Sequence, residues 1–158
     1  MRTTLIIILT LLGVSLRAQT IPPDREVLEK GEGGGMVSYA GINGYPGPRR
    51  ILEMESKLYL SEEQQKDIQA LCDGVQESAR EKGDAIIKKE EQLESMFRSG
   101  KANESDVKKL SGEIAQLRGE LRALHMIAHI EARKILTKEQ LAVCNPERGT
   151  AKKQKHNK

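Results

Sequence analysis

The segment VKKLSGEIAQLRGELRALHMIA, residues 107–128, decides the fold. Apolar or small side chains recur in it at alternating spacings of three and four residues without a break: Val107, Leu110, Ile114, Leu117, Leu121, Leu124 and Ala128. Because an α-helix turns once in about 3.6 residues, this spacing places them on one face. A seam this regular is typical of a helix that packs along its length against another helix.

The partner is the segment before it, which runs from about Ser61 to Arg98. A less regular seam follows that segment, formed by Ile68, Cys72, Val75, Ala79, Ile86, Leu93 and Met96. Ser99-Gly100 is a helix end, and Asn103 with Asp106 is a new helix start. Gly83 lies inside the first arm, where it costs about 1 kcal/mol relative to Ala, so we expect a bend or a close contact there. The prediction is an all-α fold built on a long antiparallel helical hairpin with short flanking helices.

A five-residue phrase of the form Leu-[Ser/Thr]-x-Glu-Gln stands on both sides of this hairpin. In each copy the hydroxyl side chain is an N-cap, and the Gln three residues later reaches back to the N-cap N–H, so two free donors are satisfied together. The phrase therefore predicts two helix starts of nearly identical design. The residues that carry it are Leu60, Ser61, Gln64, Leu136, Thr137 and Gln140.

The chain divides into four parts. Residues 1–18 predict a signal peptide, with an uncleaved anchor as the alternative because Leu16 is larger than the residue usually found near a cleavage point. Residues 19–47 hold no apolar periodicity and are rich in turn formers, which predicts a flexible Gly/Pro-rich linker. Residues 48–149 form the helical domain. Residues 150–158 are a basic tail, either disordered or weakly attracted to anionic lipid.

A short helix is expected at the start of the domain, from Pro48 to about Lys57, because proline suits the first helical position. Ile51, Leu52 and Met54 would form its apolar side.

Composition and charge exclude several classes. Charged residues make up 31% of the chain, which has one Phe and no Trp, and this suits a narrow apolar seam better than a thick core. The formal net charge of +3 comes from the leader and the tail, so the helical part is mildly acidic and a nucleic-acid surface is not expected. No nucleophile–base pair is recognisable, which predicts that the protein is not an enzyme. A two-helix seam covers only part of each helix, so we expect either a homodimer or an open apolar face.

Two cysteines, Cys72 and Cys144, follow the leader. In an oxidising compartment a disulfide between them would tie the hairpin to the last short helix. The alternative is a pair of small buried hydrophobic residues.

His125 and His129 lie four residues apart, so both imidazoles can reach one ion from the same side of a helix. When the hairpin is folded at its turn, these histidines fall level with Glu77 and Asp73, which would complete a cluster of two histidines and two carboxylates. The heptad phase of both acids argues against it, since neither points into the seam. Zinc, nickel or copper(II) would suit such ligands. The alternative is two half-exposed histidines on a helix flank.

The ordered set of motifs resembles the Spy/CpxP family, also called the LTXXQ family, over roughly residues 46–149. Besides the two phrases, the matching features are Tyr45-Pro46-Gly47-Pro48-Arg49, Met96-Phe97-Arg98-Ser99-Gly100 and His125-x-x-x-His129. The resemblance extends to the metal-resistance branch, which includes ZraP-like and CnrX-like proteins. Arg50 departs from that branch, which often has His there.

The resemblance implies an all-α, four-helix periplasmic stress protein, often dimeric with a concave face. One implied function is ATP-independent holding of unfolded envelope proteins. Ile87, Ile127 and Ile130 lie off the main seam and would supply apolar contacts for it; the alternative is that they pack against the terminal helices. The other is binding or sensing of a heavy metal through His125 and His129. A third interpretation is an adaptor that docks on a membrane-bound signalling partner through the basic tail.

Overall fold

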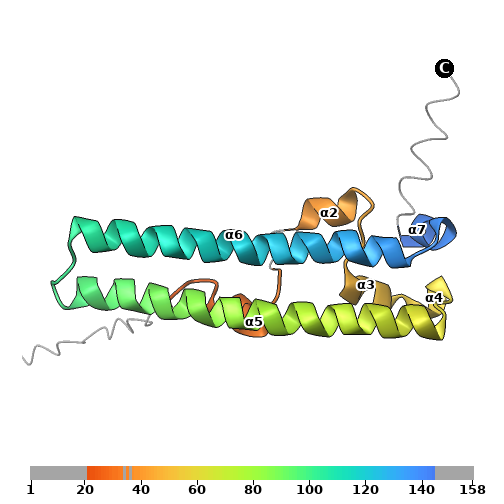
Figure 1. The fold of residues 1–158 in the computed structure, drawn as a ribbon, viewed down its shortest axis with the longest axis horizontal. Helices are drawn as coiled ribbons and strands as arrows, with labels where there is room; N and C mark the ends of the chain where they lie inside the picture. Colours follow the sequence, from red (N-terminus) through yellow and green to blue (C-terminus); the bar gives the residue numbers. More distant parts are fainter. Residues whose placement is uncertain (1–20, 34, 36, 145–158) are drawn as a thin grey trace, which may run out of the picture.

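The computed structural model describes residues 21–33, 35 and 37–144; the predicted leader and basic tail lie outside this range. Every element in the described part is a helix. Figure 1 shows their arrangement: α1 (Arg25–Lys30), α2 (Ser38–Ile42), α3 (Pro48–Glu53), α4 (Glu55–Leu58), α5 (Glu62–Arg98), α6 (Glu104–Ile135) and α7 (Lys138–Cys144). None of the helices in this part is both long and apolar enough to cross a membrane.

The predicted hairpin is confirmed. Helices α5 and α6 lie side by side along the whole molecule and are joined by a short turn (Figure 1). Gly100 ends the first arm with a φ of 67°, a left-handed conformation that glycine adopts without steric cost. The side chain of Asn103 accepts a hydrogen bond of 3.0 Å from the Asp106 N–H and so begins the second arm.

Both predicted capping boxes are also confirmed. Ser61 accepts a hydrogen bond from the Gln64 N–H, and the Gln64 side chain accepts one from the Ser61 N–H. Thr137 and Gln140 repeat the same two bonds at the start of α7. Helices α5 and α7 therefore begin with the same capping box.

The core lies in two clusters rather than in one continuous seam. The first surrounds the end where the chain enters α5 and leaves α6, and its buried members are Ile51, Leu58, Leu60, Ile68, Ala132, Leu136 and Cys144. The second lies near the middle of the hairpin and consists of Leu28, Ala79, Ile86, Ile87 and Leu121.

The predicted linker is wrong for much of residues 19–47, because this segment contains α1 and α2. Leu28 of α1 is 2% exposed and packs in the second cluster. One leucine in a short helix produces no periodic pattern in the sequence, yet it buries a full apolar side chain, and this explains the error. The same contact buries Ile87, which the sequence placed off the seam.

The predicted helix from Pro48 to about Lys57 is divided at Met54. The Met54 N–H bonds to the carbonyl of Ile51, three residues back, and the helical pattern resumes at Glu55. Tyr59 ends α4 with a φ of 49°, which turns the chain into the first capping box.

Candidate functional site

The described residues 31–33, 35 and 37–49, here called the strap, cross the face of the hairpin from α5 to α6 and back. Glycines mark its close approaches. A Cβ on Gly33 would lie 3.6 Å from the His125 ring, and one on Gly47 would lie 3.0 Å from Cε1 of His129. The second distance is shorter than an ordinary contact, so a larger residue at position 47 would displace the ring.

A pocket of about 340 Å³ lies between the strap and the hairpin. Glu32 and Arg49 of the strap line it and approach each other to 3.9 Å. The strap also contributes Gly31, Gly33, Val37, Gly47 and Pro48, and the long helices contribute Cys72, Val75, Gln76, His125, Ala128 and His129.

His129 is fixed by the strap. Its Nδ1 lies 2.6 Å from the carbonyl oxygen of Tyr45. Because a carbonyl only accepts, Nδ1 carries a proton, so in the neutral form of this ring the lone pair lies on Nε2. An imidazole that donates to a backbone carbonyl in this way is oriented as metal-bound histidines usually are.

His125 has a buried nitrogen without a partner. Its Nε2 is shielded from solvent and makes no hydrogen bond with any described residue. Burial lowers the pKa of this imidazole, and the neighbouring His129 lowers it further. A neutral ring is the form that binds a metal ion, and an unpaired buried nitrogen costs free energy unless something binds it.

The predicted carboxylate ligands are not in the pocket. Asp73 and Glu77 are exposed, and Asp73 accepts a hydrogen bond from Gln69 on the outer face of α5. Their heptad phase turns them away from α6, the objection that the sequence itself raised. Within the described residues no three His, Cys, Asp or Glu side chains lie close enough together to hold one ion, so the four-ligand cluster is wrong.

Both cysteines are free thiols, so the predicted disulfide is not formed. Cys144 is buried in the first cluster, and burial raises its pKa. Cys72 is half-buried and lines the histidine pocket. The alternative of a small buried hydrophobic residue therefore describes Cys144. Cys72 instead lies in the pocket with the two histidines, where Asp73 and Glu77 were expected.

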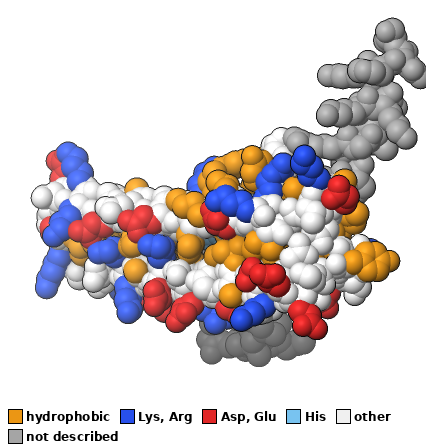
Figure 2. Space-filling view, turned by 45° about the vertical axis from the view of Figure 1, so that its right-hand side comes forward, with side chains coloured by type: hydrophobic (Ala, Val, Ile, Leu, Met, Phe, Trp, Pro, Cys, Tyr) orange, Lys and Arg blue, Asp and Glu red, His pale blue; other side chains and the backbone are white. Residues whose placement is uncertain are grey.

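A second feature is a group of exposed apolar side chains where α2 lies on α6, here called the apolar patch: Tyr39 and Ile42 of α2 with Ile127 and Ile130 of α6. Ile42 is 75% exposed, and the other three are between 40% and 54% exposed. The Tyr39 hydroxyl donates to the Met126 sulfur at 3.1 Å, which seats α2 on α6. Figure 2 shows hydrophobic side chains gathered over α2 and along the nearby hairpin, while the hairpin tip is mostly polar and charged.

The sequence indicated His125 and His129, and it singled out Cys72 as a seam or disulfide residue but not as a neighbour of the histidines. It gave no indication of the Tyr45 carbonyl or of the α2 half of the patch. Cys72 carried a signal, since it occupies a seam position next to Asp73. The Tyr45 carbonyl carried none, because any residue supplies a carbonyl.

Comparison with known proteins identifies one family. The model of the family described as heavy-metal resistance matches residues 4–142, which is most of the chain. No curated protein and no solved structure matches.

Proposed function

Since the chain belongs to the heavy-metal resistance family, which is typically periplasmic, we propose that it is a periplasmic stress protein that holds unfolded polypeptides without ATP. One observation carries the proposal: the patch of Tyr39, Ile42, Ile127 and Ile130 leaves large apolar side chains in solvent on one face. An apolar area of this kind on a soluble surface is typical of an interaction site.

Arginine side chains of α6 lie against aromatic rings of the α2 segment, and one of these rings, Tyr39, belongs to the patch. The guanidinium of Arg122 lies 5.7 Å from the centroid of the Tyr39 ring, and that of Arg133 lies 4.6 Å from the centroid of the Tyr45 ring. These cation–π pairs hold the two aromatic side chains against α6, and Arg122 places a positive charge beside the patch. Weak apolar contact edged by charge permits many different clients to bind and leave.

The test is suppression of aggregation of a reduced, unfolding client protein by the purified mature chain, without ATP. We expect suppression at a several-fold molar excess, and a several-fold loss of it in the Ile42→Ser/Ile130→Ser variant. Phe97→Ser is the matched control, because Phe97 is also exposed but lies at the hairpin tip. Equal suppression by the patch variant and the control would reject the patch as the client site.

Metal binding is the second candidate, and a different observation favours it. His125 offers an unpaired buried Nε2, and His129 offers the Nε2 lone pair that its bond to Tyr45 leaves free. Two imidazoles fit a zinc, nickel or copper(II) ion, and the thiol of Cys72 lines the same pocket. These donors alone do not complete a site, so a further ligand is required from water or from movement of the strap.

Calorimetric titration with Zn²⁺, Ni²⁺ and Cu²⁺ tests this candidate. We expect micromolar or tighter binding of one of these ions, lost in His125→Ala/His129→Ala and kept in Asp73→Ala/Glu77→Ala. Unchanged binding in the histidine variant would remove both residues from the site. The homodimer and the membrane-bound signalling partner remain predictions.

A further inference from the structure

The surface beneath α1 is built as a groove for a short helix. Leu28 inserts among Ala79, Ile86, Ile87 and Leu121, so one leucine fills an apolar socket formed by both long helices.

Gly83 forms the floor of this groove. A Cβ on Gly83 would lie 2.4 Å from the carbonyl oxygen of Leu28, a separation that no side chain tolerates. The backbone of α1 therefore lies directly on α5, and only glycine at position 83 permits it.

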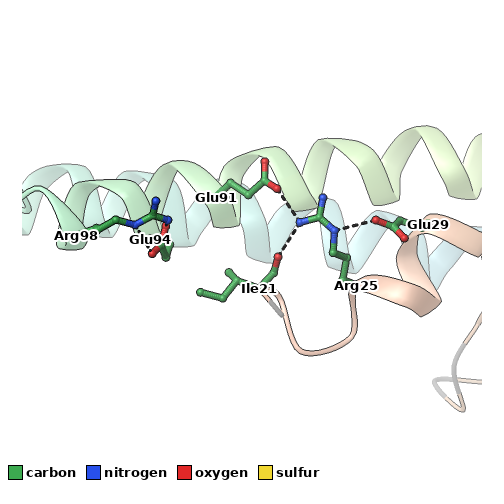
Figure 3. Close-up of polar contacts among 6 residues, drawn as sticks. All are labelled: Ile21, Arg25, Glu29, Glu91, Glu94 and Arg98. Atoms are coloured by element: carbon green, nitrogen blue, oxygen red, sulfur yellow. Dashed lines mark hydrogen bonds and ion pairs between the residues drawn. The ribbon is translucent and has the colours of Figure 1, made fainter. Parts of the chain in front are cut away.

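Charges at one end of the groove orient its occupant. Arg118 of α6 donates to both carboxylate oxygens of Asp24 at 2.6 and 3.1 Å, and also pairs with Glu90 at 3.1 Å. Figure 3 shows Arg25 reaching across to Glu91 of α5, at 2.7 Å, while it also contacts Glu29 and the carbonyl of Ile21. The groove thus recognises an acidic residue and, one helical turn later, a leucine.

The attachment of α1 is built to be reversible. A six-residue helix is not stable by itself and depends on its packing. Here two side chains are buried, Leu28 in the helix and Pro22 just before it, and the ion pairs around them are partly exposed and therefore weak. Gly31, Gly33 and Gly35 follow α1, so it can leave without disturbing the helices after the strap.

We propose that this groove is a second polypeptide-binding surface, and that α1 occupies it in the absence of a partner. The partner is an amphipathic helical segment of another polypeptide, with an acidic residue four positions before a leucine, which displaces α1. This inference rests on the proposed holding of unfolded polypeptides and adds its regulation: the chain carries its own competitor.

The test uses a fluorescent peptide with the sequence of residues 21–33, IPPDREVLEKGEG, added to the full mature chain. Leu28→Asp in the protein removes the internal competitor, so we expect the peptide to bind this variant at least tenfold more tightly than wild type by fluorescence anisotropy. Glu26→Ala is the matched control on the same helix, because Glu26 is exposed and pairs only with Lys30; it should bind like wild type.

Two further variants test the groove itself. Gly83→Ala combined with Leu28→Asp places a methyl group where the backbone of the bound helix would lie, and it should abolish the increase in peptide affinity. Asp24→Ala leaves the apolar core intact and should increase the affinity for the peptide by less than Leu28→Asp does. This variant keeps the test valid if circular dichroism shows that Leu28→Asp is not folded. If wild type and the folded Leu28→Asp and Asp24→Ala variants bind the peptide with equal affinity, the proposal is overturned.

The aggregation assay separates this inference from the proposed function. Gained peptide binding without any client protection would support the groove and reject the holding function. Client protection without any gained peptide binding would do the reverse.

Discussion

The side chains of Gln64 and Gln140 donate hydrogen bonds to each other, at 2.9 and 3.0 Å. Each amide oxygen also accepts from its own N-cap N–H, at 3.1 Å for Ser61 and 2.9 Å for Thr137. Each amide nitrogen also donates to a backbone carbonyl of the facing segment, Ile135 for Gln64 and Leu58 for Gln140. The two repeated phrases therefore form one interface, in which each glutamine caps its own helix and binds the other.

Removing either glutamine should cost more than the loss of one cap. A cap is worth about 1 kcal/mol, and the partner amide would lose a bond as well. We expect Gln64→Ala and Gln140→Ala to lower the free energy of unfolding by about 1–3 kcal/mol each, and the double variant to cost less than their sum. Urea unfolding of the four proteins measures this coupling. Strictly additive effects would contradict the mutual bond.

Glycine-to-alanine variants in α5 and α6 should have opposite effects at different positions. At Gly74 and Gly112 a Cβ would meet nothing within 4 Å, so each alanine should stabilise the helix by about 1 kcal/mol. At Gly83 the same change forces α1 off the hairpin and exposes Leu28, which costs about 1.5–3 kcal/mol and outweighs the gain. Thermal unfolding should show the first two variants above wild type and Gly83→Ala below it; a rise in all three would refute the contact.

Acidification should destabilise the protein through His125. Burial holds the pKa of this imidazole below its ordinary value, so the unfolded chain binds a proton at a pH where the folded chain does not. The stability that this difference provides is full above about pH 6.5 and is lost as the pH falls. We expect a lower melting temperature at pH 5 than at pH 7, and a smaller difference in His125→Gln. Asp24, whose pKa Arg118 lowers, becomes protonated only at still lower pH.

The thiols should differ in reactivity. Cys144 is buried and its pKa is raised, whereas Cys72 is half-buried beside a pocket. Since the thiolate is the reactive form, an alkylating reagent should modify Cys72 first in the native protein and both residues after unfolding. Mass spectrometry after trypsin digestion identifies the order. Finding no reactive thiol in the unfolded, unreduced protein would instead indicate a disulfide.

The sequence was most informative where a structural rule repeats. The hairpin, both capping boxes and the Asn103 cap follow from helix periodicity and from donors that must be satisfied. The cost of a glycine inside a helix indicated a bend or a close contact at Gly83, and the structure has the close contact. The positions of α1 and α2 do not follow, because tertiary contacts of single residues, such as Leu28 and Tyr39, stabilise them. For the same reason the histidine pair was predictable, while the residues that surround it were not.

The short helices all pack on the half of the hairpin that holds the two core clusters. From residue 88 to residue 113, across the tip, no side chain is buried, and there Lys89 pairs with Glu113 at 2.6 Å while Phe97 stays largely in solvent. Buried side chains therefore hold α5 and α6 together at one end, whereas partly exposed side chains join them near the turn. Amide protons near the turn should exchange with deuterium long before those around the two glutamines, because the two helices can separate at the tip while the other end stays folded.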